Sequence, residues 1–394
     1  MQHIILSISF VLFILYAVLI IYYAISWRSI PAASLKPLTL NLKLTVIIPA
    51  RNEEGNIKAC LDSVCNQTYP AEQYEVIVID DHSTDNTAAI VQRHPAKNIR
   101  LLSLKELLEG KQLNSYKKKA IETAIEHSTG ELIVTTDADC IVPPGWLQQI
   151  ASFYNIHNAA FIAMPVSFLP LAARDGLAAK LLSIFQSLDF MTLQGITGAS
   201  VYQRIHSMCN GANLAYSKKA FYEVNGFTGI DNIASGDDML LMHKIYKHQP
   251  DRVFFLKSTE VIVQTQPMKT LKDFLNQRIR WASKADKYDD KRIFAVLLLV
   301  YLFNVLLLVL PLICLFNIQT IFTTHYSLFT SWIYLLLLKT IVELLFLYPV
   351  AKFFNQQKLL WLFPLAQPFH IFYTVIAGWL GKFGSYQWKE RKVN

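Results

Sequence analysis

The chain has 394 residues, and 53% of them are hydrophobic, so more than one structural unit is expected. Its formal net charge is +8, but the basic residues gather beside apolar segments, as in the stretch 269–292, KTLKDFLNQRIRWASKADKYDDKR. Attraction to anionic membrane lipid explains this distribution. The sequence carries no nucleic-acid-binding motif, which excludes nucleic acid as a partner.

The first predicted element is an apolar stretch, 4–25, which carries no charge and is long enough to span a bilayer as a helix. It lacks a preceding basic region and is too long for the apolar core of a signal peptide, so we predict a membrane anchor. Arg28, Lys36 and Lys43 follow it. Basic residues favour the cytoplasmic side of a membrane, so the next segment is predicted to be cytoplasmic.

That segment has the alternating strand and helix patterns of a soluble α/β domain. Strands are predicted at four short apolar runs, 44–50, 74–80, 99–104 and 131–136. Loop-and-helix patterns follow the first two runs, and a helix over 117–127 precedes the fourth. This alternation predicts a parallel sheet with helices on both faces, whose ligands lie beyond the carboxyl ends of the strands.

Acidic residues stand at these strand ends, namely Glu53, Asp80, Asp81, Asp137 and Asp139. Asp137 and Asp139 are two residues apart, so in an extended segment they face the same way. Carboxylate oxygens suit Mg²⁺ or Mn²⁺, which proteins usually bind through one or two carboxylates together with substrate phosphates. The alternative is a solvated turn with two incidental aspartates, because a single Asp-x-Asp is common by chance.

Several motifs occur in a characteristic order, namely VIIPARNEE, VIVIDDHSTDNT, a lysine before the third helix, TTDADC, SGDDML and QRIRW. Together they resemble the family 2 glycosyltransferases over about residues 44–292. The resemblance implies the GT-A fold, an α/β Rossmann-like mixed sheet with helices on both faces, joined here to transmembrane helices. QRIRW matches the QxxRW signature of the branch that contains cellulose, hyaluronan and poly-N-acetylglucosamine synthases and the ceramide glucosyltransferases.

The resemblance also implies a nucleotide-sugar site. The residues implied to line its nucleotide pocket are Pro49, Ala50 and Glu53. Asp81 resembles the aspartate that reads the uracil edge of a UDP-sugar. Lys117 matches a pocket lysine of the family, although Tyr116 replaces the glycine that relatives have before it. Asp137 would contact the donor and, with Asp139, hold the metal ion.

Asp238, the last acid of SGDD, matches the family's general base. Most relatives have Glu-Asp here, and Asp-Asp resembles the hyaluronan synthase version. A base is required because an acceptor hydroxyl is a poor nucleophile until its proton is taken. The alternative is an acid at a helix N-terminus, where the helix dipole favours it. Both interpretations can hold if Asp237 serves the helix and Asp238 serves the chemistry.

The QxxRW residues Gln277, Arg280 and Trp281 complete the implied donor site. The rigid fork of donors on Arg280 suits a clamp on the pyrophosphate. Trp281 offers a flat face to a sugar ring, and the alternative is a tryptophan at the membrane interface.

We therefore predict a metal-dependent, membrane-bound, inverting hexosyltransferase that uses Mg²⁺ or Mn²⁺. It would move a hexose or N-acetylhexosamine from a UDP-sugar to a polysaccharide or glycan acceptor in the cell membrane. The alternatives are non-processive transfer to a lipid acceptor and an inactive scaffold or transport subunit. The predicted segments are an anchor (1–27), a linker (28–43), a GT-A domain (44–266), an interfacial segment (267–292), membrane helices (293–381) and a basic tail (382–394).

Two features of the apolar regions leave alternatives open. Lys339 and Glu343 stand four apart in a predicted span, so they can pair on one helix face as a functional site or as a structural pair. Apolar runs at 293–316, about 328–348 and about 359–381 follow the first one at 4–25. Four spans would place the basic tail outside, whereas its charge favours the inside, so the last run is predicted to be re-entrant or interfacial. The five cysteines have no metal-ligand spacing and are predicted to be free thiols.

Overall fold

The structure is a computed structural model that describes residues 2–33, 41–108, 115–170, 176–205, 208–233, 236–283, 290–316, 326–384, 386–388 and 391–393. Residues 34–40 of the predicted linker and part of the basic tail lie outside these residues. The chain forms two compact units. One, here called the sheet unit, comprises Ile30–Pro170 and Ser200–Gln266. The other, the helical unit, comprises Met1–Ser29, Leu171–Ala199 and Pro267–Asn394.

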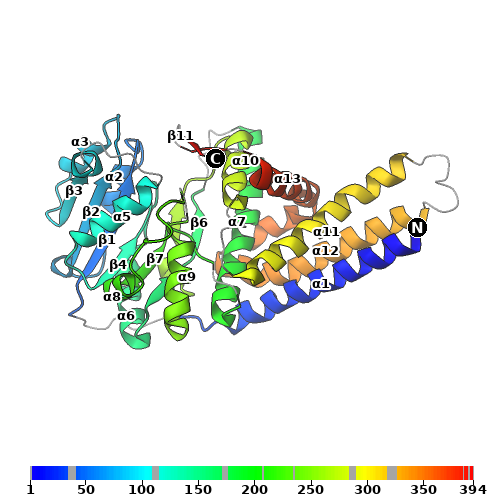
Figure 1. Ribbon diagram of the computed structural model, residues 1–394, viewed down its shortest axis with the longest axis horizontal. Helices are drawn as coiled ribbons and strands as arrows, with labels where there is room; N and C mark the ends of the chain where they lie inside the picture. Colours follow the sequence, from blue (N-terminus) through cyan, green and yellow to red (C-terminus); the bar gives the residue numbers. More distant parts are fainter. Residues whose placement is uncertain are drawn as a thin grey trace. The chain divides into compact units, whose positions relative to one another are not determined.

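The sheet unit is built on a seven-stranded mixed sheet with the order β3-β2-β1-β4-β7-β5-β8 (Figure 1). Its strands are β1 (Leu44–Ala50), β2 (Tyr74–Asp80), β3 (Ile99–Ser103), β4 (Leu132–Thr135), β5 (Phe161–Ala163), β7 (Leu214–Ser217) and β8 (Val253–Phe255). β1 pairs in parallel with β2 and β4, while β7 runs antiparallel to β4 and β5. A separate parallel pair joins β6 (Val166–Phe168) and β9 (Val263–Thr265). The four predicted strands are confirmed, and the sheet is mixed as the GT-A resemblance implied.

The burial of β1 shows why this sequence forms a central strand. Val46, Ile47 and Ile48 are all fully buried, although successive side chains of a strand point to opposite faces. Both faces of the sheet are therefore covered, as expected for parallel strands with continuous apolar runs. The helices of this unit are α2 (Ile57–Cys65), α3 (Thr87–Gln92), α4 (Leu104–Leu107), α5 (Tyr116–Glu126), α6 (Trp146–His157), α8 (Lys218–Glu223) and α9 (Met239–His248).

The helical unit contains the apolar segments. Its helices are α1 (Gln2–Ser29), the first part of α7 (Leu177–Gln203), α10 (Leu271–Ala282), α11 (Lys291–Phe316), α12 (Tyr326–Phe353) and α13 (Phe363–Phe383). Four stretches of the described chain are long and apolar enough to cross a membrane, namely His3–Ser29, Lys291–Cys314, Leu328–Phe353 and Gln357–Phe383. The last of them qualifies by length and composition although its sequence also suggested a re-entrant segment. α1, α11 and α12 pack side by side (Figure 1).

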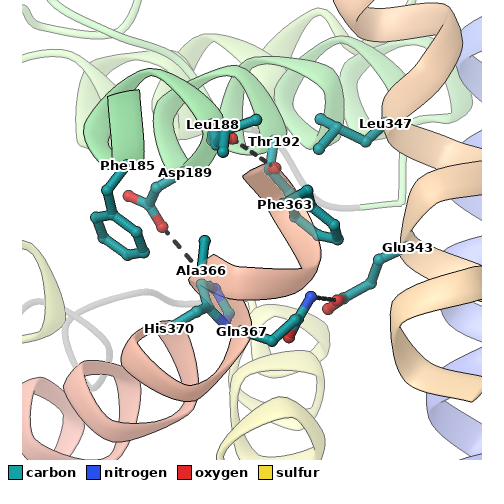
Figure 2. Close-up of a pocket in the computed structure, with 10 residues that line it drawn as sticks. All are labelled: Phe185, Leu188, Asp189, Thr192, Glu343, Leu347, Phe363, Ala366, Gln367 and His370. Atoms are coloured by element: carbon teal, nitrogen blue, oxygen red, sulfur yellow. Dashed lines mark hydrogen bonds and ion pairs between the residues drawn. The ribbon is translucent and has the colours of Figure 1, made fainter. Parts of the chain in front are cut away.

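A buried polar cluster lies inside this unit. Lys339 Nζ is 2.7 Å from Glu343 Oε1 and also donates to Gln367 Oε1 at 2.7 Å. The Tyr16 hydroxyl and the Gln367 amide donate to the same Glu343 carboxylate. The predicted pair on one helix face is thus confirmed, and its members are joined to α1 and α13. Figure 2 shows Glu343 and Gln367 on the wall of a cavity of about 30 Å³ that is lined by α7, α12 and α13.

Candidate active site

Hydrogen bonds join the loop that follows β1 to the loop that follows β2. The backbone N–H of Asp81 donates to the Ala50 carbonyl at 2.8 Å. Asn52, which has a φ of 53°, donates its backbone N–H to Ser83 Oγ at 3.0 Å and accepts from the Thr84 backbone at 2.9 Å. Asparagine is one of the few residues that adopt a left-handed backbone at small cost. These bonds fix the predicted pocket residues around Ala50 against the end of β2.

Asp81, the predicted uracil-reading residue, is buried beside two basic side chains. Its Oδ1 lies 3.0 Å from His82 Nδ1 and 3.8 Å from Arg51 Nη1. Arg51 also donates to the Asp81 carbonyl at 3.2 Å. The His82 ring meets the Tyr116 ring edge-on at a centroid distance of 5.5 Å. Sequence analysis did not single out Arg51 or His82, although both stand inside the motifs that carried the resemblance.

Asp137 and Asp139 follow β4, but the geometry predicted for them is wrong. They do not lie in an extended segment, because residues 138 and 139 form a turn in which Cys140 N–H donates to the Asp137 carbonyl at 3.1 Å. Asp139 Oδ2 accepts from the Thr265 hydroxyl at 3.1 Å. Sequence reasoning missed Thr265, whose strand lies far along the chain.

The acids at this edge still influence one another. Burial raises the pKa of Asp139 to about 6, and the negative charges of Asp137 and Glu53 add to the effect. Within the described ranges, no group of three or more His, Cys, Asp or Glu side chains is arranged to hold a metal ion. Two carboxylates, of which Asp137 raises the pKa of Asp139, fit a hard divalent cation that takes its remaining ligands from substrate phosphates.

Lys117 connects this acidic group with the SGDD motif. Its Nζ is 2.8 Å from Asp137 Oδ1 and 3.3 Å from Asp237 Oδ2. Burial alone would lower the pKa of Lys117, but the charges of Asp137, Asp237 and Asp238 outweigh it and hold the pKa above its ordinary value. Gly211 lies in the same group, because a Cβ atom there would be 3.5 Å from both Lys117 Nζ and Asp237 Oδ2.

Asp238 occupies the N-cap of α9. Its Oδ1 accepts from the Met239 backbone N–H at 2.7 Å, and its Oδ2 accepts from the Gly211 backbone N–H at 3.0 Å. The division of labour predicted for the Asp pair is therefore wrong in one respect. Asp238 caps the helix, as Asn, Asp and Ser commonly do, and Asp237 forms the ion pair with Lys117.

A second lysine of α5, Lys118, binds the backbone of two residues that precede Asp237 and Asp238 in the sequence. Lys118 is 1% exposed and donates to the carbonyls of Ile230 and Ile233, each at 2.6 Å. A buried ammonium needs such partners because an unpaired charge is costly away from water. Sequence analysis missed this role, because nothing in a run of three lysines shows that the middle one is buried.

The QxxRW residues belong to α10 of the helical unit. Arg278, between Gln277 and Arg280, donates from Nη1 to Gln277 Oε1 at 2.9 Å. Its guanidinium carbon also lies 4.3 Å from the centre of the Trp281 ring. The Ser283 hydroxyl donates to the Arg280 carbonyl at 3.0 Å. One face of Trp281 is thus in contact with a cation of the same helix.

Comparison with known proteins agrees with this architecture. The sequence model described as "Glycosyl transferase family 2" matches residues 45–223, from β1 to α8. Residues 45–223 therefore resemble a family 2 glycosyltransferase domain, and the sheet unit has a GT-A-like mixed sheet. It is similar in structure to the mannosyltransferase PcManGT from Pyrobaculum calidifontis, solved with GDP-Man and Mn²⁺, with a TM-score of 0.56 and 20% identity. The match covers 87% of this chain and 97% of that one.

Two curated relatives match a shorter stretch. Glycosyltransferase AglE of Haloferax volcanii is 39% identical over 106 residues, which is 27% of this chain and 33% of AglE. A beta-monoglucosyldiacylglycerol synthase of Synechocystis sp. is 28% identical over 116 residues, which is 28% of this chain and 23% of the synthase. The chain thus spans a third or less of the length of these relatives.

Proposed function

We propose that the protein is a membrane-bound inverting glycosyltransferase. It transfers a hexose or N-acetylhexosamine from a UDP-sugar to a glycan or lipid acceptor at the cytoplasmic face of the cell membrane. One observation carries the proposal: Lys117 joins acidic residues from two motifs at one edge of a family 2 glycosyltransferase domain. The four candidate spans support attachment to a membrane. In this proposal 44–266 is the catalytic domain, 267–292 an interfacial segment and 382–394 a basic tail.

The donor binds where the loops after β1 and β2 are fastened together. Pro49 and Ala50 end β1 there, Glu53 follows them, and Asp81 presents its carboxylate between Arg51 and His82 to read the base. Asp139 and Asp137 would hold Mg²⁺ or Mn²⁺, which supplies Lewis-acid neutralisation of the charge on the departing diphosphate. Lys117 holds the Asp137 carboxylate in place through their ion pair.

Asp238 acts on the acceptor. It takes the proton of the acceptor hydroxyl as the oxygen forms a bond to the anomeric carbon and the bond from that carbon to the diphosphate breaks. UDP leaves in this single displacement, so the anomeric configuration inverts. The two backbone N–H groups that donate to its oxygens orient the carboxylate, and a base must be held within reach of the proton it takes.

The proposal includes membership of the QxxRW branch, which the presence of Gln277, Arg280 and Trp281 supports. Arg280 clamps the pyrophosphate through its planar fork, Gln277 supplies an amide beside it, and Trp281 offers its ring to the sugar. An inactive scaffold or transport subunit is disfavoured, because Asp139, Asp238 and Arg280 are all present.

A lipid acceptor is the second candidate. It is supported by the similarity to a synthase named for a glucosylated diacylglycerol and by a number of candidate spans that is small for a polymer channel. In this version each turnover adds one sugar to one lipid.

The test is sugar transfer by the purified protein in lipid nanodiscs. A panel of UDP-sugars, with GDP-mannose for contrast, is supplied with Mg²⁺, Mn²⁺ or chelator, and products are identified by mass spectrometry. We expect one UDP-sugar to give a glycosylated lipid or glycan only when metal is present, and the Asp238→Asn variant to give none. Absence of product from every donor, or an equal yield from the variant, contradicts the proposal.

A further inference from the structure

The second residue of the QRIRW motif, Arg278, is a buried arginine with a defined partner. Its Nε and Nη2 lie 3.0 and 2.5 Å from Asp189 Oδ2 on α7, and both side chains are less than 5% exposed. Tyr373 of α13 donates its hydroxyl to the other oxygen of Asp189, and His370 Nε2 lies 3.9 Å from that oxygen. Figure 2 shows the Asp189 carboxylate directed at His370. Three helices thus meet at one carboxylate.

The remaining contacts of Arg278 are made within α10. Nη1 donates to the side-chain oxygen of Gln277, and the guanidinium plane is stacked on Trp281 at 4.3 Å and on Phe274 at 4.7 Å. A guanidinium can do all of this at once because its donors lie in one plane and its faces stay free for aromatic rings. Gln277 and Trp281 are two of the three residues that the proposed function uses on this helix.

We infer that Arg278 is a positioning residue: held by Asp189, it sets the side-chain orientation of Gln277 and Trp281 for sugar transfer. The inference rests on the proposed function in assigning those two residues to substrate. Arg278 itself touches no substrate, because its donors on Nε and Nη2 are used by Asp189 and its faces by aromatic rings. Displacement of a binding group by about 1 Å is enough to lower a rate by ~10²-fold.

Arg278→Lys is the informative variant. An ammonium can keep the ion pair with Asp189, but it cannot also bond Gln277 and stack on Trp281. We expect kcat/KM for the UDP-sugar to fall about tenfold, an effect of the size seen for coupled neighbours. Gln277→Ala should show a similar loss, and the double variant should be no more than about twofold worse than Gln277→Ala alone. Arg292→Lys, a change at an exposed arginine bonded to Asp290, is the matched control and should be parental.

The fluorescence of Trp281 and the kinetics of the double variant separate this role from a purely structural one. The emission assigned to Trp281, obtained by difference from a Trp281→Phe variant, should shift in Arg278→Lys whether or not a substrate has been found. Asp189→Asn, which keeps an acceptor oxygen, should give the same shift if Arg278→Lys fails to fold. An unchanged Trp281 signal, parental kinetics, or losses that multiply in the double variant would each overturn the inference. A parental protein that transfers no sugar counts against the proposed function alone, because the Trp281 signal still reports on Arg278.

Discussion

Lys117 and Asp137 form an ion pair in which Nζ lies 2.8 Å from Oδ1, and the same ammonium is 3.3 Å from Asp237. Asp137 belongs to the proposed metal site, and Asp237 stands next to the proposed base. One cation therefore connects the donor side of the site with its acceptor side. A metal ion at Asp139 and the ammonium at Asp237 would divide the negative charge of the cluster between them.

Removing this cation should destabilise the domain. We expect Lys117→Met to lower the free energy of unfolding by about 2 kcal/mol, the size typical of hydrogen bonds to charged groups. The pKa of Lys117 is raised by its acidic neighbours, so its contribution is complete below its unfolded-state pKa and is lost only as the pH rises through the higher folded-state pKa. Thermal unfolding at pH 7 measures the effect. Lys119→Met is the control, because Lys119 pairs with Glu122 on the surface of the same helix and should matter by less than about 0.5 kcal/mol.

Metal binding should depend on pH through Asp139. Burial and the nearby charges raise the pKa of this carboxyl to about 6, so in the metal-free protein it carries a proton below that pH. A proton and a cation compete for the same oxygens, and the affinity for Mn²⁺ should fall about tenfold per pH unit as the pH drops below about 6. Calorimetric titration with Mn²⁺ at several pH values tests this.

The same pKa shift has a consequence for the stability of the metal-free protein. Because the folded-state pKa lies above the unfolded value, Asp139 favours the folded state below its unfolded pKa, and this contribution is lost as the pH rises through about 6. Asp139→Asn should remove both pH effects and most metal-dependent turnover while the domain stays folded. A variant with parental turnover in chelator would show that the metal site is elsewhere.

The sheet could be predicted from the sequence because short continuous runs of apolar residues encode its strands. The apolar runs of β1 and β2 are typical of strands buried on both faces, and the helix between them predicts that they run parallel. The acid geometry could not be predicted in the same way. Asp139 is fixed by a turn at Cys140 and by Thr265 from β9, and neither contact is visible in the spacing of the two aspartates.

The polar clusters of the helical unit show the same limit. The Lys339–Glu343 pair could be predicted, because both residues lie on one helix at a spacing of four. Their partners Tyr16 and Gln367 come from α1 and α13, so tertiary packing alone brings them in. Arg278 was visible within QRIRW, but nothing in the sequence pointed to Asp189 as its partner.

Arg280 tests the proposed pyrophosphate clamp. Arg280→Lys keeps the positive charge but replaces a planar fork with a single ammonium, which cannot bind a diphosphate in the same bidentate way. We expect kcat/KM for the UDP-sugar to fall by at least about tenfold, in line with a lost charge-assisted bond. Steady-state kinetics in nanodiscs measure it. Near-parental kinetics would assign Arg280 to the membrane surface.

The effects of substituting Lys339 and Glu343 on stability should be strongly coupled. Lys339 is fully buried, so Lys339→Met leaves the Glu343 carboxylate without its cation, and breaking a buried pair in this way typically costs about 3–5 kcal/mol. Lys339→Met combined with Glu343→Gln removes both charges, while the amide oxygen still accepts from Tyr16. The double variant should therefore unfold closer to the parent than the single variant does. Melting temperatures in detergent provide the comparison, and equal or additive losses would show that the two charges are independent.

Measurements of donor affinity and transfer rate on the same variants can distinguish the role of Asp238 from that of Asp237. If Asp238 is the base, Asp238→Asn should abolish sugar transfer yet leave UDP-sugar binding nearly unchanged, because an amide cannot take the acceptor proton. Asparagine caps helices about as well as aspartate, and its oxygen can still accept from the Met239 backbone, so the structural cost is that of the bond from the Gly211 backbone N–H, which an amide nitrogen cannot accept.

Asp237→Asn is the matched change one residue away, and it weakens the ion pair with Lys117 without removing the cap. We expect it to slow transfer by less than Asp238→Asn and to lower the melting temperature more, because a charge-assisted bond is lost. Calorimetry with the UDP-sugar beside initial transfer rates compares the two variants directly. An inactive Asp237→Asn with an active Asp238→Asn would move the base by one residue. Equal loss of donor binding in both would assign the pair to the nucleotide site, since a base acts on the acceptor and contributes nothing to holding the donor.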